Sequence, residues 1–549
     1  MTQTFIPADL EATDFVPLQS PSRQPGAAQS PVLHLRYGAG NVTLSGDVSA
    51  FVGHRIGPRD SSLGLYGSWQ WDGDTLRAEV DPLGFFSLFV YQNGTEIALS
   101  PSILQLLALG ADPEPDRIAL AVFHRIGSFL GEDTPFRHIK VLPPGGKLVW
   151  REGVATVTGN LAIPREQALT RVQAVEGFID LPRAAIRRFL AAWDGPIVLP
   201  LSGGRDSRHI LLELVHQGRK PDTAATFHQG GRYLDREVLA ARAITARAGV
   251  PHTLLGHPRR RLRDALRAVL LTQLCADEHA QMMPMHDFLA GSPSAAVLDG
   301  IGGDILTNPD DSAADFFDRA RKGDYDGIAR KLAAGHGSVI SRAGHPGGAG
   351  AIHSPDLEEA AITRIAQAIR AFDAAPDPYQ AFWFWNRTRR EIAFVSTGIL
   401  GGAAMVSCPF LSPEFVELGL SLPFSVTRDQ KLHDDAIAKA YPDFADIPYE
   451  AGFRGQPLPR LRWGRVANVL DGLHVSTLAQ PGLAGLPAVW QLVTKSSLRR
   501  GPADVYRLHG QFVDAMNSTE ARRLIALEAR LAQSAPKGQE VVSDVFSSA

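Results

Sequence analysis

One six-residue segment constrains the fold more than any other part of the chain. Ser202-Gly-Gly-Arg-Asp-Ser207 follows an apolar run at residues 195–201 and precedes a stretch with helical spacing from Arg208. The apolar run is typical of a buried strand, so the two glycines fall in a strand-to-helix turn. Glycines there let backbone N–H groups approach an anion, toward which the following helix directs the positive end of its dipole. The segment therefore predicts an anion-binding loop in a parallel α/β sheet.

The polar residues of this loop fit a nucleotide phosphate together with a divalent cation. Ser202 and Ser207 offer hydroxyl donors, whereas Asp206 repels a phosphate and belongs beside one only as a ligand of Mg²⁺. The loop is not a Walker A motif, because it lacks the Gly-Lys-Ser/Thr ending. A tight turn with a serine helix cap is the alternative interpretation.

A second glycine-rich loop, Asp299-Gly-Ile-Gly-Gly-Asp304, follows an apolar run at residues 295–298. Between the two loops, residues 223–228 and 252–255 have the composition of strands, and residues 235–248 have helical spacing. Strands that alternate with helices in this way indicate a parallel sheet, whose ligands bind at the carboxyl ends of the strands. We therefore expect both loops at one edge of one sheet.

The two loops together predict a site for a triphosphate and Mg²⁺. Asp304 is placed like Asp206, and two carboxylates from separate strand ends can share one metal ion over a triphosphate. We expect Asp206 and Asp304 to be metal ligands and to act in catalysis. The residues expected to bind the nucleotide are Leu201, Ser202, Gly203, Gly204, Asp206, Ser207, Phe227, Gly300, Gly302 and Gly303. An ordinary glycine turn is the alternative interpretation of the second loop taken alone.

The first part of the chain has a different pattern from the second. Short apolar runs alternate with turn signals, such as Asp72-Gly73 and Asn93-Gly94, which is typical of β-hairpins. We expect an α/β protein in which a mostly β domain precedes a parallel α/β domain with a helical C-terminal part. The predicted divisions are a flexible lead-in at 1–30, the β domain at 31–165, the α/β domain at 166–534 and a disordered polar tail at 535–549.

Composition excludes several classes of protein. The net charge of −3 gives no global electrostatic reason to expect nucleic acid or an anionic membrane as a partner. The two cysteines, Cys275 and Cys408, are too few for a disulfide framework or a cysteine zinc cluster. No apolar stretch approaches the ~20 residues that cross a bilayer, and the first 30 residues lack a secretory signal pattern. A cytoplasmic protein is expected.

These motifs resemble those of the asparagine synthetase family, which includes β-lactam synthetases and lasso-peptide macrolactam synthetases. The segment 202–207 resembles the pyrophosphate-binding loop of the PP-loop ATP pyrophosphatases. Asp81-Pro-Leu-Gly84 resembles part of the family's glutaminase-like domain, and Pro409-Phe-Leu411 with Lys431 resembles part of its synthetase domain. The resemblance covers roughly residues 60–455. It implies a glutaminase-like (Ntn-type) N-terminal domain and a PP-loop synthetase domain.

The resemblance also implies an activity. A substrate carboxylate would be activated by ATP as an acyl-adenylate with release of pyrophosphate, and an amine or ammonia would then form the amide. The implied partners are ATP and a small-molecule or peptide carboxylate. For the alternative of a lasso-peptide cyclase or another specialised amide synthetase, they would include a precursor peptide and a protease. A nucleotide-binding pseudoenzyme or scaffold is an alternative of a different class.

The chain departs from the family at several positions. Thr2 stands near the start, where family glutaminases carry a nucleophilic cysteine, and no cysteine precedes Cys275. Glutamine hydrolysis is therefore not expected. Ile301, Met405 and Ser407 replace residues that assist amide formation in the family.

These replacements leave the proton acceptor for amide formation to other residues. Glu278, His279 and Glu391 are the candidates by chain position, and histidine has an unperturbed pKa near neutrality. We therefore include His279 among the catalytic residues, with an exposed helix end as the alternative interpretation. The charges from Arg387 to Glu391 predict ion pairs along one helix, with a substrate or phosphate contact as the alternative.

Overall fold

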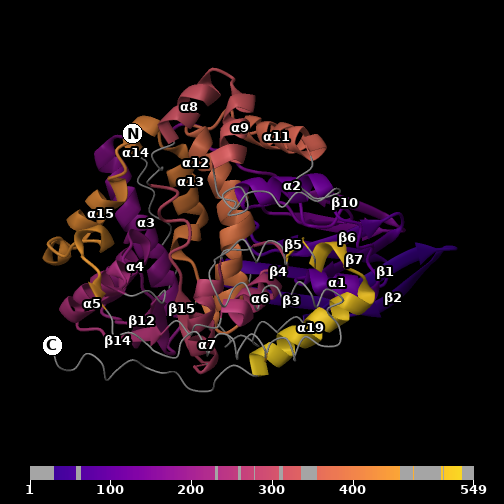
Figure 1. Ribbon diagram of the computed structural model, residues 1–549, viewed down its shortest axis with the longest axis horizontal. Helices are drawn as coiled ribbons and strands as arrows, with labels where there is room; N and C mark the ends of the chain where they lie inside the picture. The colour runs from indigo at the N-terminus through magenta and orange to yellow at the C-terminus, as the bar shows by residue number, and fades with distance from the viewer. Residues whose placement is uncertain are drawn as a thin grey trace.

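The computed structural model describes residues 30–56, 64–228, 233–256, 261–276, 279–292, 294–307, 313–335, 355–457, 474, 509–510 and 512–533. Two antiparallel sheets come first in the chain, and a parallel sheet with many helices follows (Figure 1). The predicted α/β class, with a β-rich part before a parallel α/β part, is confirmed at this level.

Two five-stranded antiparallel sheets form the N-terminal part. The first has the order β2-β1-β7-β6-β8 and the second the order β10-β9-β5-β4-β3. Their strands are β1 (Leu33–Gly38), β2 (Asn41–Gly46), β3 (Ser49–Arg55), β4 (Gly64–Trp71), β5 (Thr75–Val80), β6 (Phe89–Asn93), β7 (Glu96–Ser100), β8 (Ile139–Val141), β9 (Lys147–Arg151) and β10 (Val154–Thr158).

The predicted hairpin turns are confirmed. Strands β4 and β5 pair around Gly73, which has a φ of +100°, and the Asp72 carboxylate accepts the backbone N–H groups of Asp74 and Thr75 at 3.0 and 2.8 Å. Strands β6 and β7 pair around Gly94, with a φ of +58°. Both glycines occupy the left-handed region, where a side chain is unfavourable.

Alternate strand residues bury a core that is shared by the two sheets. Trp69, Leu76 and Trp150 of the second sheet lie in one buried cluster with Leu33 and Leu99 of the first. The other face of the first sheet lies under helices α1 (Ile103–Leu109) and α2 (Arg117–Ile126), in a separate, larger cluster. The arrangement follows the period-two alternation of strand side chains.

The second part of the chain is built around a parallel sheet with the order β14-β12-β11-β15-β16. These strands are β11 (Ile197–Pro200), β12 (Thr223–His228), β14 (His252–Gly256), β15 (Ala296–Leu298) and β16 (Met405–Ser407); β13 (Tyr233–Leu234) pairs with β17 (Gln456–Pro457). The α-helices are α3 (Arg171–Ala192), α4 (Arg205–His216), α5 (Arg236–Ala248), α6 (Arg261–Leu271), α7 (Met283–Ala290), α8 (Ala313–Arg321), α9 (Tyr325–Gly335), α11 (Pro355–Arg370), α12 (Pro378–Trp383), α13 (Pro413–Ser421), α14 (Phe424–Thr427), α15 (Leu432–Ala440) and α19 (Ser518–Gln533). Shorter helical turns are η3 (His279–Met282), η6 (Pro409–Leu411), η7 (Pro442–Phe444) and η8 (Glu450–Gly452), and two π-helical segments are η4 (Phe384–Ile392) and η5 (Val395–Leu400).

The strand order contains one reversal, and it lies between β11 and β15. From β11 the chain moves outward through β12 to β14, and then returns to place β15 on the other side of β11. Loops that leave the carboxyl ends of two such strands diverge and leave a crevice between them. The two glycine-rich loops follow β11 and β15, so the fold places them at this reversal.

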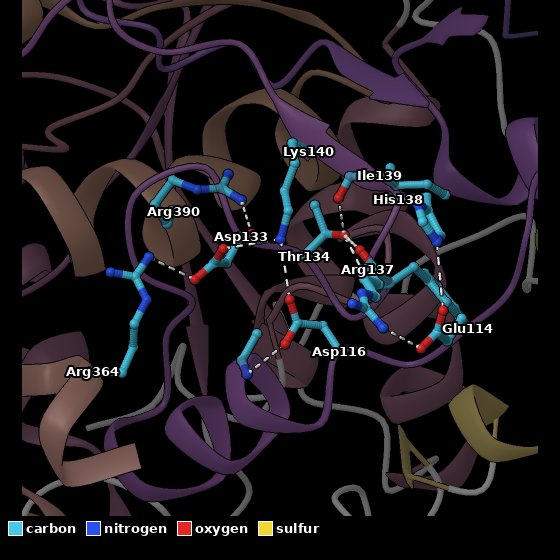
Figure 2. A network of polar contacts seen from close by, with 12 residues as sticks. Glu114, Asp116, Asp133, Thr134, Arg137, His138, Ile139, Lys140, Arg364 and Arg390 are labelled. Atoms are coloured by element: carbon cyan, nitrogen blue, oxygen red, sulfur yellow. Dashed lines mark hydrogen bonds and ion pairs between the residues drawn. The ribbon is translucent and has the colours of Figure 1, made fainter. Parts of the chain in front are cut away.

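Polar contacts join the two parts of the chain. Figure 2 shows Asp133 of the N-terminal part between Lys140, Arg364 of α11 and Arg390 of η4. Its carboxylate accepts Lys140 and Arg364 at 3.0 and 2.9 Å, and its backbone oxygen accepts Arg390 at 2.7 Å. Arg390 is 1% exposed and also donates to the backbone oxygen of Gly131 at 2.8 Å, so backbone oxygens rather than water stabilise its charge.

Helix α19 also lies against the N-terminal part. It packs beside α1, and Arg522 donates to the backbone oxygen of Ala108 at 2.8 Å (Figure 1). Helix α19 also contacts α6, so the last described helix lies between the N-terminal part and the helices of the second part.

Several segments of unusual composition are described only in part or not at all. Arg263, at the end of a basic run over residues 257–263, lies in α6 and is 4% exposed, while residues 257–260 lie outside the described residues. The glycine-rich residues 336–351, the lead-in and the tail lie outside the described residues. Among the described residues, no helix is long and apolar enough to cross a membrane.

Candidate functional site

A cavity of about 810 Å³ lies at the carboxyl ends of β11 and β15. Residues of both glycine-rich loops line it, together with residues from β12, α5, α7, α12 and η4. The expectation that the two loops meet at one edge of the sheet is confirmed.

Hydroxyl groups fix the shape of the first loop. Ser207 Oγ accepts the backbone N–H of Ser202 at 3.1 Å, and Ser202 Oγ accepts the backbone N–H of Gly204 at the same distance. Helix α4 begins at Arg205, whose guanidinium pairs with the Asp434 carboxylate of α15 at 2.5 and 3.1 Å. The loop is thus tied to α4 and to α15, and the amino end of α4 lies at the cavity.

Gly203 lies where two other segments come close to the loop. A Cβ atom at this position would lie 2.8 Å from Cβ of Glu450 and 2.9 Å from Cα of Glu237. The backbone N–H of Glu450 donates to the Gly203 carbonyl at 3.3 Å. Burial and the neighbouring Glu450 raise the pKa of Glu237, which lines the cavity, to about 6.

The second loop lies directly against Asp206. A Cβ atom at Gly300 would lie 2.6 Å from Cβ of Asp206, and one at Gly303 would lie 2.7 Å from the Asp206 carboxylate. The backbone N–H of Asp304 donates to Oδ2 of Asp206 at 3.1 Å. Glycine is therefore required at 300 and 303 because the two loops approach each other closely. The backbone conformation of a turn is not the reason.

Three carboxylates come together at this contact. Asp206, Asp299 and Asp304 all line the cavity. Burial first, and then the charge of Asp304, raise the pKa of Asp206 well above its ordinary value. Burial also raises the pKa of Asp299, although Ser396 Oγ donates to its carboxylate at 2.5 Å.

This arrangement fits a divalent cation. Oδ1 of Asp206 is buried without a hydrogen-bond partner, and the like charges around it are costly unless a proton or a metal ion neutralises them. Asp206 and Asp304 would supply two carboxylate ligands, and Mg²⁺ ordinarily completes its shell with phosphate oxygens and water. The donor set thus suits a metal ion that is bound together with a phosphate group.

Two buried histidines stand behind Asp206. His433 Nδ1 lies 3.4 Å from Asp206 Oδ1, and His433 Nε2 lies 3.0 Å from Nδ1 of His209. Both side chains are fully buried, and burial lowers the pKa of His433 to about 3. Burial also lowers the pKa of His209 well below its ordinary value. Both rings are therefore neutral near pH 7.

Several apolar and aromatic residues from other elements also line the cavity. Ile126 ends α2, while Tyr379 and Trp383 lie on α12 and Ile392 lies on η4. Arg387, also on η4, lines the cavity as well, and its guanidinium is 3.9 Å from the Glu391 carboxylate. The aromatic residues 382–385 are all buried, and Trp383 also lines the cavity.

Most of the predicted nucleotide-binding residues lie at the cavity. Those that line it are Leu201, Ser202, Asp206, Ser207, Phe227, Gly300 and Gly302, and the predicted metal ligand Asp304 lines it too. Gly203, Gly204 and Gly303 belong to the same loops and act through the backbone contacts given above. The structure therefore brings the two predicted loops together as one site.

His279 is placed differently from the expected exposed helix end. It is 9% exposed, and its Nε2 lies 2.5 Å from the Glu391 carboxylate, which is itself 1% exposed. It is not among the residues that line the cavity. The alternative interpretation of an exposed helix end was wrong, because the imidazole of His279 is buried against the Glu391 carboxylate of η4. Glu278 lies outside the described residues.

Some site residues carried no recognisable signal in the sequence. Asp299 appeared only as the start of the second loop, and Tyr379 and Ile126 lie in segments far from either loop. Of the three replaced helper positions, Ile301 lines the cavity, whereas Met405 and Ser407 are buried in β16. An apolar wall contributed by distant helices has no local motif.

A further group of possible metal ligands lies on the surface of the N-terminal part. Asp112, Glu114 and His138 are close together, but Arg137 already occupies one Glu114 oxygen at 2.8 Å (Figure 2). None of these three residues lines the cavity; Glu114 is exposed and the other two are half-buried, and acidic groups at a surface are common without a metal ion.

The chain matches no protein-family description, and no curated protein is significantly similar to it.

Proposed function

We propose that the protein is an ATP-dependent amide-forming ligase of the asparagine synthetase type. The observation that carries this proposal is the contact between Asp206 and Asp304 across the reversal of the parallel sheet. It joins a hydroxyl-rich loop at a helix amino end with a pair of carboxylates, and phosphate and Mg²⁺ need these two kinds of group together.

The proposed chemistry has two steps. An oxygen of the substrate carboxylate attacks the α-phosphorus of ATP, the bond to the bridging oxygen breaks, and pyrophosphate leaves with its electron pair. The nitrogen of an amine or of ammonia then attacks the acyl carbon, loses a proton, and AMP leaves. The two loops hold the nucleotide, and Mg²⁺ between Asp206 and Asp304 would neutralise charge that develops on the phosphates.

The nitrogen source is proposed to be an amine or ammonia rather than glutamine. Burial raises the pKa of Cys275 to about 12 and that of Cys408 well above its ordinary value. A thiol in this state does not supply the thiolate that glutamine cleavage needs. Glutamate release from glutamine, with and without ATP, tests this point, and steady release above a blank would refute it.

Pyrophosphate exchange tests the ligase proposal. Purified protein with Mg²⁺, ATP, labelled pyrophosphate and a panel of carboxylic acids is expected to form labelled ATP. Asp206→Asn and Asp304→Asn are each expected to lower the rate at least 100-fold, because a lost metal ligand removes several kcal/mol of charge stabilisation. Asp315→Asn, a change at a surface ion pair of α8, is the matched control and should retain the wild-type rate. Wild-type exchange in both site variants would refute the assignment.

A nucleotide-binding pseudoenzyme is the second candidate. Ile301 favours it, because an apolar side chain lines the cavity at a position where the resemblance places a helper residue. Binding of Mg-ATP without pyrophosphate exchange by any acid would support this candidate over the first.

A further inference from the structure

One loop of the N-terminal part is connected with the cavity lining in two ways. It spans residues 127–138, between α2 and β8, and it begins directly after Ile126, which lines the cavity. Gly131 of this loop contacts η4, the π-helical segment from which Thr388 and Ile392 line the same cavity. The N-terminal part is therefore joined to the cavity both directly and through η4.

Both backbone groups of Gly131 are bound by η4. Its N–H donates to Oδ1 of Asn386 at 2.9 Å, and its carbonyl accepts Nε of Arg390 at 2.8 Å. Because Asn386 and Arg390 are 3 and 1% exposed, these hydrogen bonds lie out of reach of bulk water. Gly131 is thus fixed to η4 through its backbone alone.

A second loop of the N-terminal part also contacts η4. The Gly84 carbonyl accepts Nε of Arg389 at 3.3 Å, and the Phe85 ring lies 5.4 Å from the ring of Phe384. The buried Asp81 carboxylate shapes this loop, because it accepts three backbone N–H groups between residues 83 and 86 at 2.8 to 3.2 Å. The loop that carries the resemblance to a glutaminase-like domain is thus in contact with η4, and this contact does not require glutamine hydrolysis.

The hydrogen bonds and ion pairs of Arg389 and Arg390 all reach oxygen atoms of the N-terminal part. Within the described residues, these oxygens are the carbonyls of Gly84, Gly131 and Asp133, the Ser87 hydroxyl and the Glu132 carboxylate. The two guanidinium groups are 0 and 1% exposed, so burial of their charges would be costly without these oxygens. The position of η4 therefore depends on the N-terminal part.

Residues with two different contacts alternate along η4. Thr388 and Ile392 line the cavity, whereas Asn386, Arg389 and Arg390 contact the N-terminal part. All five belong to one helical segment of nine residues, so a displacement of the arginines moves the two cavity-lining residues with them. π-Helical segments are rare and occur frequently at functional sites.

We propose that the N-terminal part is a positioning element for the cavity, and that Arg389 and Arg390 are the positioning residues that fix η4 against the loops at Gly84 and Gly131. This inference goes beyond the proposed function, because it holds for a ligase and for a nucleotide-binding pseudoenzyme alike. It gives a role to a part of the chain for which glutamine hydrolysis is not expected.

Amide hydrogen exchange of the full chain, measured by mass spectrometry, tests the role of the two arginines. Arg389→Lys and Arg390→Lys keep the charge but cannot reproduce the guanidinium contacts, so residues 384–392 are expected to exchange roughly tenfold faster than in the wild type. Arg364→Lys is the matched control, because Arg364 also pairs with Asp133, at 2.9 Å, but from α11 rather than from η4. This control should leave exchange in η4 unchanged (Figure 2).

The place of the change in exchange separates positioning from ordinary destabilisation. Faster exchange that is confined to η4 and the segments beside the cavity supports the proposal. Unchanged exchange in both lysine variants, or an equal acceleration over the whole chain, would overturn it. Asn386→Ala, which removes the acceptor of the Gly131 N–H without a change in charge, supplies the same measurement if a lysine variant does not fold.

The pyrophosphate-exchange assay adds a readout at the cavity itself. The two lysine variants should lower kcat/KM for the acid by roughly tenfold, because small displacements of groups around a reacting centre slow the reaction. A wild-type kcat/KM in variants whose η4 exchanges faster would overturn the positioning role. If the wild type catalyses no exchange with any acid, the ligase proposal fails, and the hydrogen-exchange comparison still decides whether the N-terminal part fixes η4.

Discussion

His433 Nδ1 lies 3.4 Å from Oδ1 of Asp206, the carboxylate to which Asp304 donates its backbone N–H from the other side. The imidazole is fully buried and is in turn held by His209. Because burial keeps both rings neutral, Asp206 faces a dipole rather than a counter-ion. Its negative charge is therefore left for a ligand in the cavity to neutralise.

We expect His433→Ala to weaken Mg²⁺ binding in the presence of ATP by roughly tenfold, the effect of removing a residue that orients a metal ligand. His433→Asn should recover part of this affinity, because its amide also places a neutral polar group beside the Asp206 carboxylate. Titration calorimetry with Mg-ATP measures both. Equal affinities in the wild type and the alanine variant would show that His433 only fills space.

Asp206→Asn should stabilise the metal-free protein at neutral pH. The folded-state pKa of Asp206 is raised, so its favourable contribution to folding is complete below the unfolded pKa of ~3.9 and is lost as pH rises through the folded value. The amide removes that loss. In EDTA, the urea midpoints of the wild type and the variant should move apart as pH rises from 4 to 8. A constant difference between the two midpoints would contradict the raised pKa of Asp206.

Gly303→Ala should abolish pyrophosphate exchange without unfolding the protein. Its Cβ would lie 2.7 Å from the Asp206 carboxylate, so the two loops must separate by several tenths of an ångström or more. Gly323→Ala is the control. No atom lies within 4 Å of a Cβ at this position, and the only strain comes from its φ of +74°. We expect Gly323→Ala to cost stability alone, about 1 kcal/mol, and to leave exchange unchanged.

The sequence predicts the position of the two loops well because their signals are local. Glycines, serines and aspartates at strand ends are recognisable without tertiary information, and β11, β12 and β15 lie where the apolar runs indicate. The reason for Gly300 and Gly303 is different from the one that the pattern suggests, because it depends on Asp206, about 100 residues earlier.

The lining residues that come from distant helices could not be predicted in this way. Ile126, Tyr379 and Arg387 come from three helices, and their sequence signal is that of ordinary core or ordinary surface charge. His279 illustrates the same difficulty, since its neighbours in the chain are polar while its partner Glu391 is more than 100 residues away. Packing between distant helices decides these positions, and local periodicity does not encode it.

Glu237→Gln should stabilise the protein above about pH 6. Burial raises the folded pKa of Glu237 to about 6 from an ordinary value near 4.5, so its contribution to stability is complete below pH ~4.5 and is lost as pH rises through about 6. The gain should be about 1 kcal/mol once partial exposure is allowed for. Thermal unfolding at pH 5 and pH 8 checks this, and a variant that is less stable at pH 8 would contradict the raised pKa.

His279→Ala separates two roles that this residue can have. Its imidazole contacts the buried Glu391, whose carboxylate holds Arg387 at the cavity wall. Removing it leaves a buried carboxylate with a poorer partner, which typically costs about 3 kcal/mol. It also loosens Arg387, so we expect pyrophosphate exchange and amide formation to fall together, by tenfold or more, with a rise in KM for the acid. Glu391→Gln should reproduce this pattern, because it removes the charge that His279 and Arg387 share.

The sequence-based role of His279 as proton acceptor stays a prediction, and it requires the opposite result: a loss confined to amide formation, with normal exchange and an altered pH profile for the second step. The two assays, run on the same preparation at several pH values, decide between positioning and proton transfer.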